Sequence, residues 1–373
     1  MGEYINIYIT EGGRTKRSTD DTYHPETYNL DLPLSKSHLN LHLTRNDNIR
    51  TSVPTLSLKD HSVTYTNLED KIFGTFNVGS EEYIVQTPKN KTYTKLKSGF
   101  NHFEIRKEKI PEIDFNDFLG KADTIKQATF TNRNHRHKRA TGLHQLELLI
   151  VVDYAVYKYW YDQSTQTSTS QKETEALTSV RQYYAFVITG MDGMYKNIQT
   201  SSYTIDIVYA GIVIAQTPSD ATWTETVKVT SFTPNRVDSS TALQNFQTWN
   251  RNPPFSLPGH DHAMLFTRYD LTASGSNGNA GLAYVGRVCT TSSQSIVEDG
   301  FNFVIISVAA HELGHCLSAE HDGEGNACSG SDAYIMASAV SPQTEAATAT
   351  HPWIFSTCST SYFTTYITNS LDS

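Results

Sequence analysis

Long apolar runs are absent from the sequence. No stretch approaches the roughly eighteen consecutive apolar residues that a membrane-spanning helix needs, so we expect no membrane span. The first residues, MGEYINIYIT, also lack the basic start and the apolar core of a secretory signal peptide. If the protein is secreted, its signal peptide lies upstream of the visible sequence.

Cysteine is scarce and confined to one part of the chain. Residues 1–139 have none, and the four cysteines are Cys289, Cys316, Cys328 and Cys358. An even number within one domain favours two disulfides formed in an oxidising compartment, which predicts a secreted, extracellular protein. Four cysteines allow three connectivities. We expect Cys289–Cys358 and Cys316–Cys328, the second pair because its members lie close together in the sequence.

The charge is distributed unevenly about Arg139. The net charge of −9 divides into +3 over residues 1–139 and −12 over residues 140–373. The acidic part argues against binding to nucleic acid. Residues 132–139, NRNHRHKR, are basic and carry no apolar anchor, which predicts an exposed linker between two domains, 1–139 and 140–373.

The same linker contains a pattern for proteolytic processing. Arg136-x-Lys138-Arg139 resembles the recognition site of furin-type convertases, which would cut after Arg139. A solvated basic loop without cleavage is the alternative. We favour cleavage because composition, charge and cysteine content all change at this point.

Hydrophobic periodicity predicts a β-rich first domain and an α/β second domain. Short alternating runs at 38–43 and 82–85 are typical of strands. In the second domain, an apolar run at 146–152 is followed by helical spacing at 173–197 and a strand pattern at 203–215. Strand, helix and strand in this order predict a buried sheet. Further expected elements are a helix at 239–249 and strands at 262–267 and 281–285.

The segment 301–317, FNFVIISVAAHELGHCL, carries the clearest chemical signal. It is apolar nearly all round and follows Asp299-Gly300, a candidate N-cap, which predicts a buried helix. His311 and His315 are four residues apart, so both imidazoles lie on one face and can bind one ion. His321 can fold back as a third ligand. Three histidines with a fourth position for water are typical of catalytic zinc.

Glu312 lies beside these histidines and is the expected general base. It would accept a proton from the zinc-activated water and later deliver it to the leaving amine. A structural zinc site would need a fourth protein ligand, and none is suitably spaced. The other alternative is a secreted zinc-binding toxin or interaction protein that acts without turnover, against which the intact Glu312 argues. His260 and His262 flank Asp261 without a third ligand, so we interpret them as structural.

A methionine, Met336, follows His321 and completes a wider pattern. His-Glu-x-x-His-x-x-Gly-x-x-His with a later methionine turn is the signature of the metzincin clan, with Ser318 here in place of the glycine. Asp322 and three segments more closely resemble the reprolysin (adamalysin, ADAM-like) branch, over residues 144–368. These segments are 261–267, 281–286 and 297–299. Residues 1–139 more weakly resemble the propeptide of that family.

The resemblance implies a zinc endopeptidase that hydrolyses protein substrates and is made as a zymogen. Its fold would be α/β (α+β), with a mixed, mostly parallel sheet and an active-site helix after a β-rich prodomain. One catalytic Zn²⁺ is implied, and a structural Ca²⁺ is a further candidate. The prodomain would act as inhibitor and a furin-like convertase as activator. Because residues 1–139 lack cysteine, a thiolate on zinc is excluded, and inhibition must come from the prodomain covering the cleft or from another ligand.

The resemblance also implies roles for residues outside the histidine motif. The strand formed by Gly281, Leu282, Ala283, Tyr284 and Val285 would be the sheet edge on which substrate lies extended. Met336 would lie in a hydrophobic turn beneath the zinc ligands. At Ser318 the chain must leave the helix at positive φ, which for a residue other than glycine costs on the order of 1–2 kcal/mol.

Overall fold

A computed structural model describes most of residues 142–371 and, before them, the backbone of nine strands. Residues 199, 201, 274–275, 303, 341–347 and 349 are the gaps in the former range. The chain divides into two compact units, the first formed by Met1–Asp47 and Glu69–Lys109, the second by Asn48–Leu68 and Ile110–Ser373. The predicted linker with Arg139 lies outside the described residues, so its cleavage stays a prediction.

The first unit contains two antiparallel sheets of three strands each, in the orders β1-β2-β3 and β6-β7-β8. Their bounds are Tyr8–Glu11 (β1), Thr27–Leu34 (β2), Ser37–Thr44 (β3), Phe73–Val78 (β6), Glu81–Gln86 (β7) and Glu104–Glu108 (β8). The strands predicted at 38–43 and 82–85 are therefore confirmed, and the described part of this unit is β-rich as expected.

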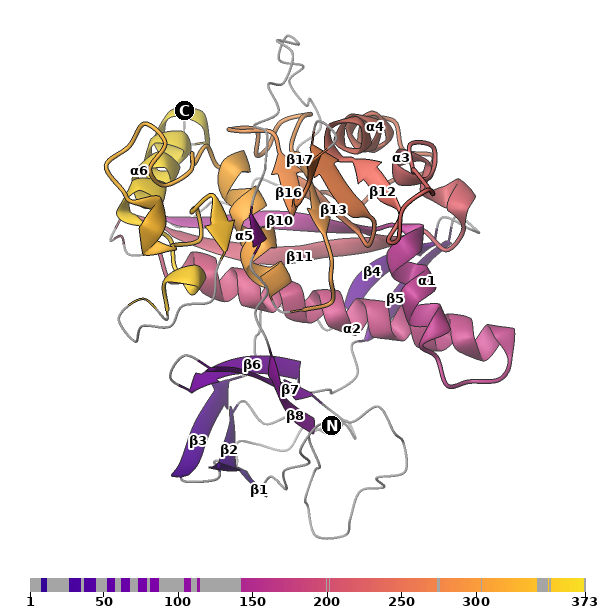
Figure 1. The fold of residues 1–373 in the computed structure, drawn as a ribbon, viewed down its shortest axis with the longest axis horizontal. Helices are drawn as coiled ribbons and strands as arrows, with labels where there is room; N and C mark the ends of the chain where they lie inside the picture. The colour runs from indigo at the N-terminus through magenta and orange to yellow at the C-terminus, as the bar shows by residue number, and fades with distance from the viewer. Residues whose placement is uncertain are drawn as a thin grey trace. The chain divides into compact units, whose positions relative to one another are not determined.

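The second unit is built on a seven-stranded mixed sheet in the order β16-β17-β13-β10-β11-β4-β5 (Figure 1). Four of its six strand pairs are parallel, and the antiparallel pairs are β16–β17 and β4–β5. The bounds are Gly281–Ala283 (β16), Gln294–Glu298 (β17), His262–Thr267 (β13), Leu143–Val152 (β10), Thr204–Ile214 (β11), Ser52–Ser57 (β4) and Ser62–Asn67 (β5). The predicted mixed, mostly parallel sheet is confirmed.

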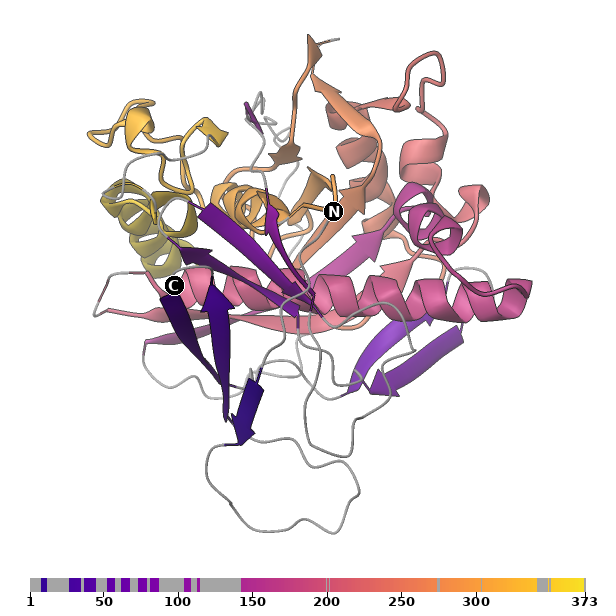
Figure 2. The ribbon, with the colours of Figure 1, turned by 60° about the horizontal axis from the view of Figure 1, so that its bottom comes forward.

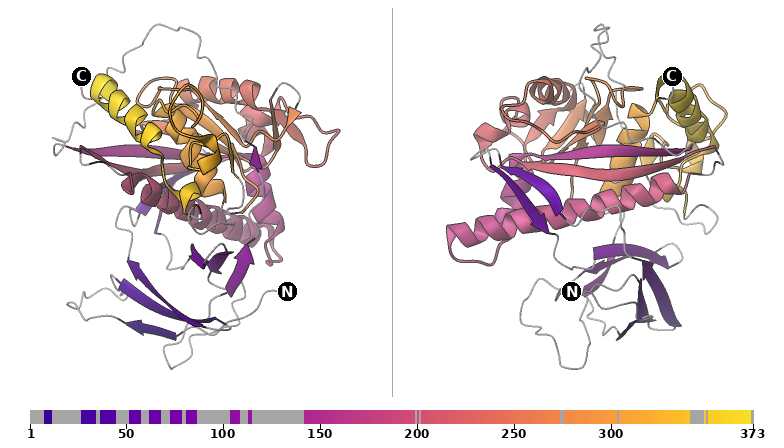
Figure 3. Two further views of the ribbon diagram at one scale, coloured as in Figure 1. Left: turned by 60° about the vertical axis from the view of Figure 1, so that its left-hand side comes forward. Right: turned by 180° about the vertical axis from the view of Figure 1, so that it is seen from behind.

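Helices cover both faces of this sheet, which suits the nearly continuous apolar runs at 148–152 of β10 and 207–214 of β11. The bounds are Tyr154–Asp162 (α1), Thr169–Lys196 (α2), Thr222–Glu225 (α3), Ser239–Arg251 (α4), Val304–Cys316 (α5) and Thr357–Tyr366 (α6). Trp223 of α3 and Phe246 of α4 pack in one core with Leu149, Val213 and Leu265 of the sheet. On the other side, α2 runs along β11 and packs against α5 (Figures 2 and 3).

Shorter elements connect these layers. A small sheet joins β12 (Arg236–Asp238), β14 (Asp270–Ala273) and β15 (Ser276–Asn277), and β9 (Ile113–Asp114) pairs with β18 (Ala339–Val340). Single turns form η1 (Pro218–Asp220), η2 (Gly330–Asp332), η3 (His351–Trp353) and η4 (Ile367–Leu371). In the described part of the chain, none of the helices has the length and apolar character to cross a membrane.

The predicted N-cap of the active-site helix is wrong. The helix α5 begins at Val304, and Phe301 before it has a positive φ of 55°. The Asp299 carboxylate accepts hydrogen bonds from the hydroxyls of Tyr183 (2.9 Å) and Tyr184 (2.7 Å) and from the Phe301 N–H (2.7 Å). Its burial raises the pKa of Asp299 to about 6. Asp299 thus connects the segment just before α5 to α2 through hydrogen bonds and does not cap the helix.

Candidate metal and catalytic centre

The helix α5 that carries the histidine motif is buried along its whole length. All its residues from Val304 to Cys316 are buried, as the nearly unbroken apolar sequence predicts. Gly190 of α2 lets the two helices approach closely, since a Cβ there would lie 2.6 Å from the Ile306 side chain. The Tyr195 hydroxyl donates to the Ala310 carbonyl oxygen at 2.9 Å. Packing against α2 therefore fixes α5 just before its histidines.

The helix ends in a turn that redirects the chain toward the third histidine. The Ala319 N–H donates to the Gly314 carbonyl (3.0 Å) and the Ser318 N–H to the His315 carbonyl (2.8 Å). This pair of bonds is a Schellman motif, in which the residue at Ser318 adopts the left-handed conformation. Its φ is +77°, so the positive φ expected for this departure from the family glycine is confirmed.

Three imidazoles meet after this turn with their Nδ1 atoms held from outside. His311 Nδ1 lies 2.7 Å from the Ile335 carbonyl oxygen and His315 Nδ1 lies 2.7 Å from that of Ala319. His321 Nδ1 lies 3.2 Å from a Glu324 carboxylate oxygen. A carbonyl or carboxylate oxygen only accepts, so each Nδ1 carries the hydrogen and each neutral ring keeps a lone pair on Nε2.

The three Nε2 atoms point at one another. His315 Nε2 lies 3.0 Å from His311 Nε2 and 3.2 Å from His321 Nε2. With no hydrogen on any Nε2, the lone pairs repel unless a cation lies among them. Tetrahedral zinc with bonds of 2.0–2.1 Å separates its nitrogen ligands by about 3.3 Å, which this cluster nearly matches. The three predicted ligands are thus brought together in a geometry that suits zinc.

A second group of residues near the triad does not offer a metal site. Asp322 lies close to Cys328 and Cys358, but the two sulfur atoms are bonded to each other. Sulfur in a disulfide is not a thiolate and cannot serve as a zinc ligand. Among the described residues, the His311, His315 and His321 cluster is therefore the candidate metal centre, and a structural Ca²⁺ stays a prediction.

The turn that carries Met336 supports the triad through backbone carbonyl groups. Besides the Ile335 carbonyl on His311, the Met336 carbonyl accepts the Asp322 N–H at 2.8 Å. Met336 is fully buried, and a Cβ at Gly314 would lie 2.6 Å from its sulfur atom. The glycine in the helix thus makes room for the methionine. The structure therefore places the predicted Met-turn directly against the helix and the ligands.

Glu312 lies fully buried against the predicted substrate strand. A Cβ at Gly281 would lie 2.4 Å from Glu312 Oε1, so only glycine leaves space for the carboxylate. The Asn279 side-chain carbonyl accepts the Gly281 N–H at 3.1 Å and holds this end of the strand. The sequence placed Gly281 in the edge strand but gave no sign of its contact with Glu312. Strand β16 is shorter than predicted and ends at Ala283.

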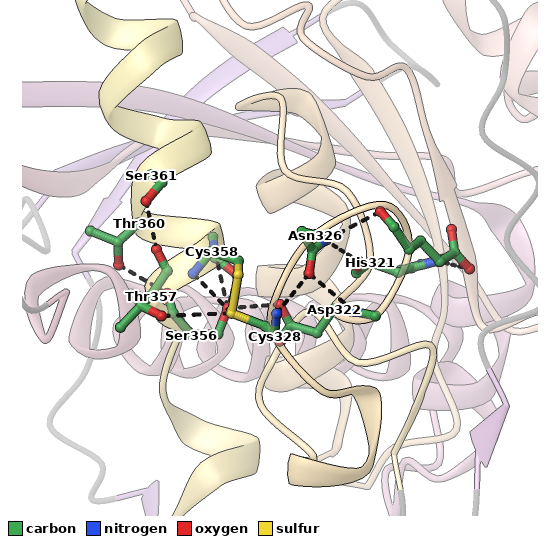
Figure 4. Close-up of a disulfide and its surroundings, with 12 residues drawn as sticks. His321, Asp322, Asn326, Cys328, Ser356, Thr357, Cys358, Thr360 and Ser361 are labelled. Carbon is green, nitrogen blue, oxygen red and sulfur yellow. Dashed lines mark hydrogen bonds and ion pairs between the residues drawn. A yellow bond between two sulfur atoms is a disulfide. The ribbon is translucent and has the colours of Figure 1, made fainter.

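The loop after His321 is fastened to α6 (Figure 4). The Asn326 side-chain amide donates to the His321 carbonyl at 2.7 Å. The Ser356 hydroxyl donates to the Asp322 carboxylate at 2.7 Å and also caps α6 by accepting the Ser359 N–H. Sequence reasoning missed Asn326 and Ser356, because single polar residues in loops carry no motif.

The predicted disulfide pairing is wrong. Cys328 and Cys358 form the bond, instead of Cys289–Cys358 and Cys316–Cys328. Cys316 ends a buried helix with its sulfur 3.8 Å from the Gln294 carbonyl of β17, so closeness in sequence does not bring it to Cys328. Cys289 donates to the Asp261 carboxylate at 3.2 Å. Burial, followed by the charge of Glu312, raises the pKa of Cys316 well above its usual value, which keeps it a thiol.

Of the two histidines predicted to be structural, His262 is confirmed as part of the core. It is fully buried, and its ring nitrogens lie 3.0 Å and 2.8 Å from the hydroxyls of Ser293 and Ser295. Burial lowers its pKa to about 3, so the ring is neutral. His260 precedes the strand and its Nδ1 lies 2.8 Å from the Pro258 carbonyl. Neither residue belongs to the metal cluster.

A family model agrees with this geometry. The model of a reprolysin group described as metallo-peptidase family M12 matches residues 143–348, more than half of the chain. The chain belongs to metallopeptidase family M12. The reprolysin-type metzincin family predicted from the histidine motif is thus confirmed, and with it the class of enzyme, a metallopeptidase.

Curated relatives are similar over parts of the chain. A disintegrin and metalloproteinase with thrombospondin motifs 14 from Homo sapiens is 25% identical over 308 residues, which cover 78% of this chain and 22% of the relative. A protein of Bombyx mori, a disintegrin and metalloproteinase with thrombospondin motifs like, is 28% identical over 56% of this chain and 29% of its own length. A third relative, a disintegrin and metalloproteinase with thrombospondin motifs 10 from Homo sapiens, is 33% identical over 33% of this chain and 11% of its own length. The chain therefore spans under a third of these relatives.

Proposed function

We propose that this chain is the precursor of a secreted zinc endopeptidase. The observation that carries the proposal is the convergence of three histidine Nε2 atoms beside a buried glutamate. His311, His315 and His321 would hold the ion, which supplies Lewis acidity that polarises the substrate carbonyl and acidifies water. The scaffold is that of metallopeptidase family M12.

Glu312 would serve as the general base. Its carboxylate comes from the residue next to His311, on the same helix, and faces the strand on which substrate would lie. It takes the proton from the attacking water and passes it to the leaving amine, as the tetrahedral carbon collapses. The carboxylate must stay at one place through both transfers, which the close contact with Gly281 ensures.

Strand β16 would align the substrate. It is the terminal strand of the described sheet and pairs with β17 on one side only. An extended peptide can add to such an edge through main-chain hydrogen bonds, which accept many sequences. This mode of binding suits a protease that acts on internal bonds of protein chains.

Residues 1–139 would keep the enzyme inactive until a furin-like convertase cuts after Arg139. In support, β9 of this part pairs with β18, whose first residue Ala339 follows Met336 by three positions. A segment held there lies on the same stretch of chain as the Met-turn and can obstruct the cleft without any thiolate. The disulfide Cys328–Cys358 supports an oxidising, extracellular location.

Peptide cleavage by the protein after processing at the linker tests the proposal. A chelator should abolish cleavage, and zinc should restore it. Glu312→Ala should retain one zinc per chain yet lose cleavage by at least about 100-fold, the range of general acid–base catalysis. Cleavage that survives the chelator would refute the mechanism. A Glu312→Ala protein with its full biological effect would favour a binding protein that acts without turnover.

A further inference from the structure

The seven-stranded sheet contains a hairpin that comes from the N-terminal part of the chain. Strands β4 and β5 belong to the second unit, although residues on both sides of them belong to the first. Strand β4 runs parallel to β11, with Thr55 opposite Ile212, Leu56 opposite Val213 and Ser57 opposite Ile214. Figure 3 shows the hairpin beside the long strand β11. The hairpin thus extends the sheet of the metallopeptidase domain.

Without this hairpin, β11 would be an edge strand. In the order of the sheet, β10 covers one side of β11 and only β4 covers the other. Strand β11 is long and buried from Val208 to Ile214, and Ile212, Val213 and Ile214 have no exposed surface. A long apolar strand with open backbone groups promotes pairing with other chains. The catalytic domain therefore needs a cover at this edge.

The sequence of the hairpin suits a segment that covers the edge of a sheet. Pro54 lacks an N–H and comes just before the three residues of β4 that pair with β11, so it lies where this ladder ends. The outer strand β5, SVTYTN, is short and mostly polar, which suits the new edge of the sheet. The hairpin thus replaces an apolar edge by a polar one.

We propose that residues 48–68 are a strand-addition partner of the catalytic domain and stay bound at β11 after the chain is cut at the linker. The active enzyme would then be a non-covalent complex of two chains, in which β9 has left β18 while β4 stays paired with β11. Strand β16, the proposed substrate edge, lies at the opposite end of the sheet order from β4 and β5. A hairpin that stays bound therefore leaves the substrate edge open. Its role is to cover β11, whereas inhibition depends on β9 at β18. The inference rests on the proposed cleavage.

Retention after cleavage can be measured on the full chain carrying Glu312→Ala and a C-terminal affinity tag. The protein is cut at the linker with a furin-type convertase and captured by the tag. Residues 1–139 should be recovered in equimolar amount with the C-terminal fragment. Leu56→Pro should abolish recovery, because proline breaks the β4 ladder. The matched control Ile84→Pro, in the middle of β7 of the first unit, should retain it.

Amide hydrogen exchange of the uncut chain tests the same contact in the intact protein. Backbone amides of Ile212, Val213 and Ile214 should all exchange slowly. Those facing β4 should exchange at least about tenfold more slowly than in Leu56→Pro, the factor that one net hydrogen bond provides. Fast exchange of every second amide of this run in the wild type would overturn the proposal, as would full retention of residues 1–139 by Leu56→Pro. A protein whose Glu312→Ala form retains the hairpin but whose wild-type form cleaves no peptide refutes the proposed function alone.

Discussion

The contact between Gly281 and Glu312 gives the sharpest prediction. An alanine at position 281 would place its Cβ 2.4 Å from Glu312 Oε1, 2.7 Å from Cδ and 2.8 Å from Cγ. Ordinary van der Waals contact starts at 3.4 Å, so the carboxyl group has to move by about 1 Å. A misplacement of this size costs about 100-fold in rate, or about 2.7 kcal/mol of transition-state stabilisation. We therefore expect Gly281→Ala to lower kcat by about two orders of magnitude.

The assay is cleavage of an internally quenched peptide over a range of pH, with zinc content measured on the same samples. Zinc content should stay at one per chain, because the three atoms nearest to a Cβ at position 281 all belong to Glu312 and none to a histidine. The fall should be in kcat, and the acidic limb of the kcat/KM profile should move, since the base changes its surroundings. A variant in which KM rises and kcat is unchanged would show that the methyl group obstructs substrate binding. A wild-type kcat would show that Gly281 does not set the position of Glu312.

Gly193→Ala is the matched control for this substitution. Gly193 lies within α2, and a Cβ there would meet nothing within 4 Å. Catalysis should be unchanged. Stability should rise by about 0.4–1 kcal/mol, because alanine reduces the entropy of the unfolded chain. Urea denaturation of both glycine variants separates a loss of folding from a loss of catalysis.

Three further predictions concern stability. Ser318→Gly relieves the positive φ and should stabilise the protein by about 1 kcal/mol with unchanged peptide cleavage, as measured by urea denaturation; destabilisation would contradict the left-handed turn. Replacing Cys328 and Cys358 by serine opens a cross-link with a sequence separation of 30 and should cost about 3–4 kcal/mol. Denatured wild-type protein that has not been reduced should show two titratable thiols, those of Cys289 and Cys316. A protein without titratable thiols would instead contain the two disulfides expected from the sequence. Burial raises the pKa of Asp153 from 3.8 to about 7, so its contribution to stability is present below the lower value and lost as pH rises to the higher one. The stability of Asp153→Asn relative to wild type should therefore rise by up to about 1.4 kcal/mol per pH unit in this window, and a flat difference between pH 4 and 7 would contradict the burial argument.

The sequence predicts the elements around the motif well, because their patterns are local. The strand at 262–267 has the predicted bounds, and the helix expected at 173–197 extends from Thr169 to Lys196. The spacing of His311, His315 and His321 was sufficient to predict that their rings meet. Helical periodicity and a short turn bring the three rings together.

Contacts between distant segments could not be predicted in the same way. The disulfide partner of Cys358 depends on how the loop after His321 folds against α6, and the sequence carries no period for that loop. Asp299 resembles an N-cap in the sequence, yet two tyrosines of α2, more than a hundred residues earlier, take its carboxylate. The addition of β4 to β11 was also not foreseen, because backbone pairing between distant strands has no side-chain motif.

We expect the Nε2 lone pairs of the three histidines to bind one zinc ion beside Glu312. Anomalous diffraction from crystals of the zinc-loaded protein, collected on both sides of the zinc absorption edge, tests it most directly. We predict one peak about 2.0–2.1 Å from Nε2 of His311, His315 and His321, with no sulfur within bonding distance. A peak bound to the Cys316 sulfur, or no peak among the three rings, would rule out this metal site.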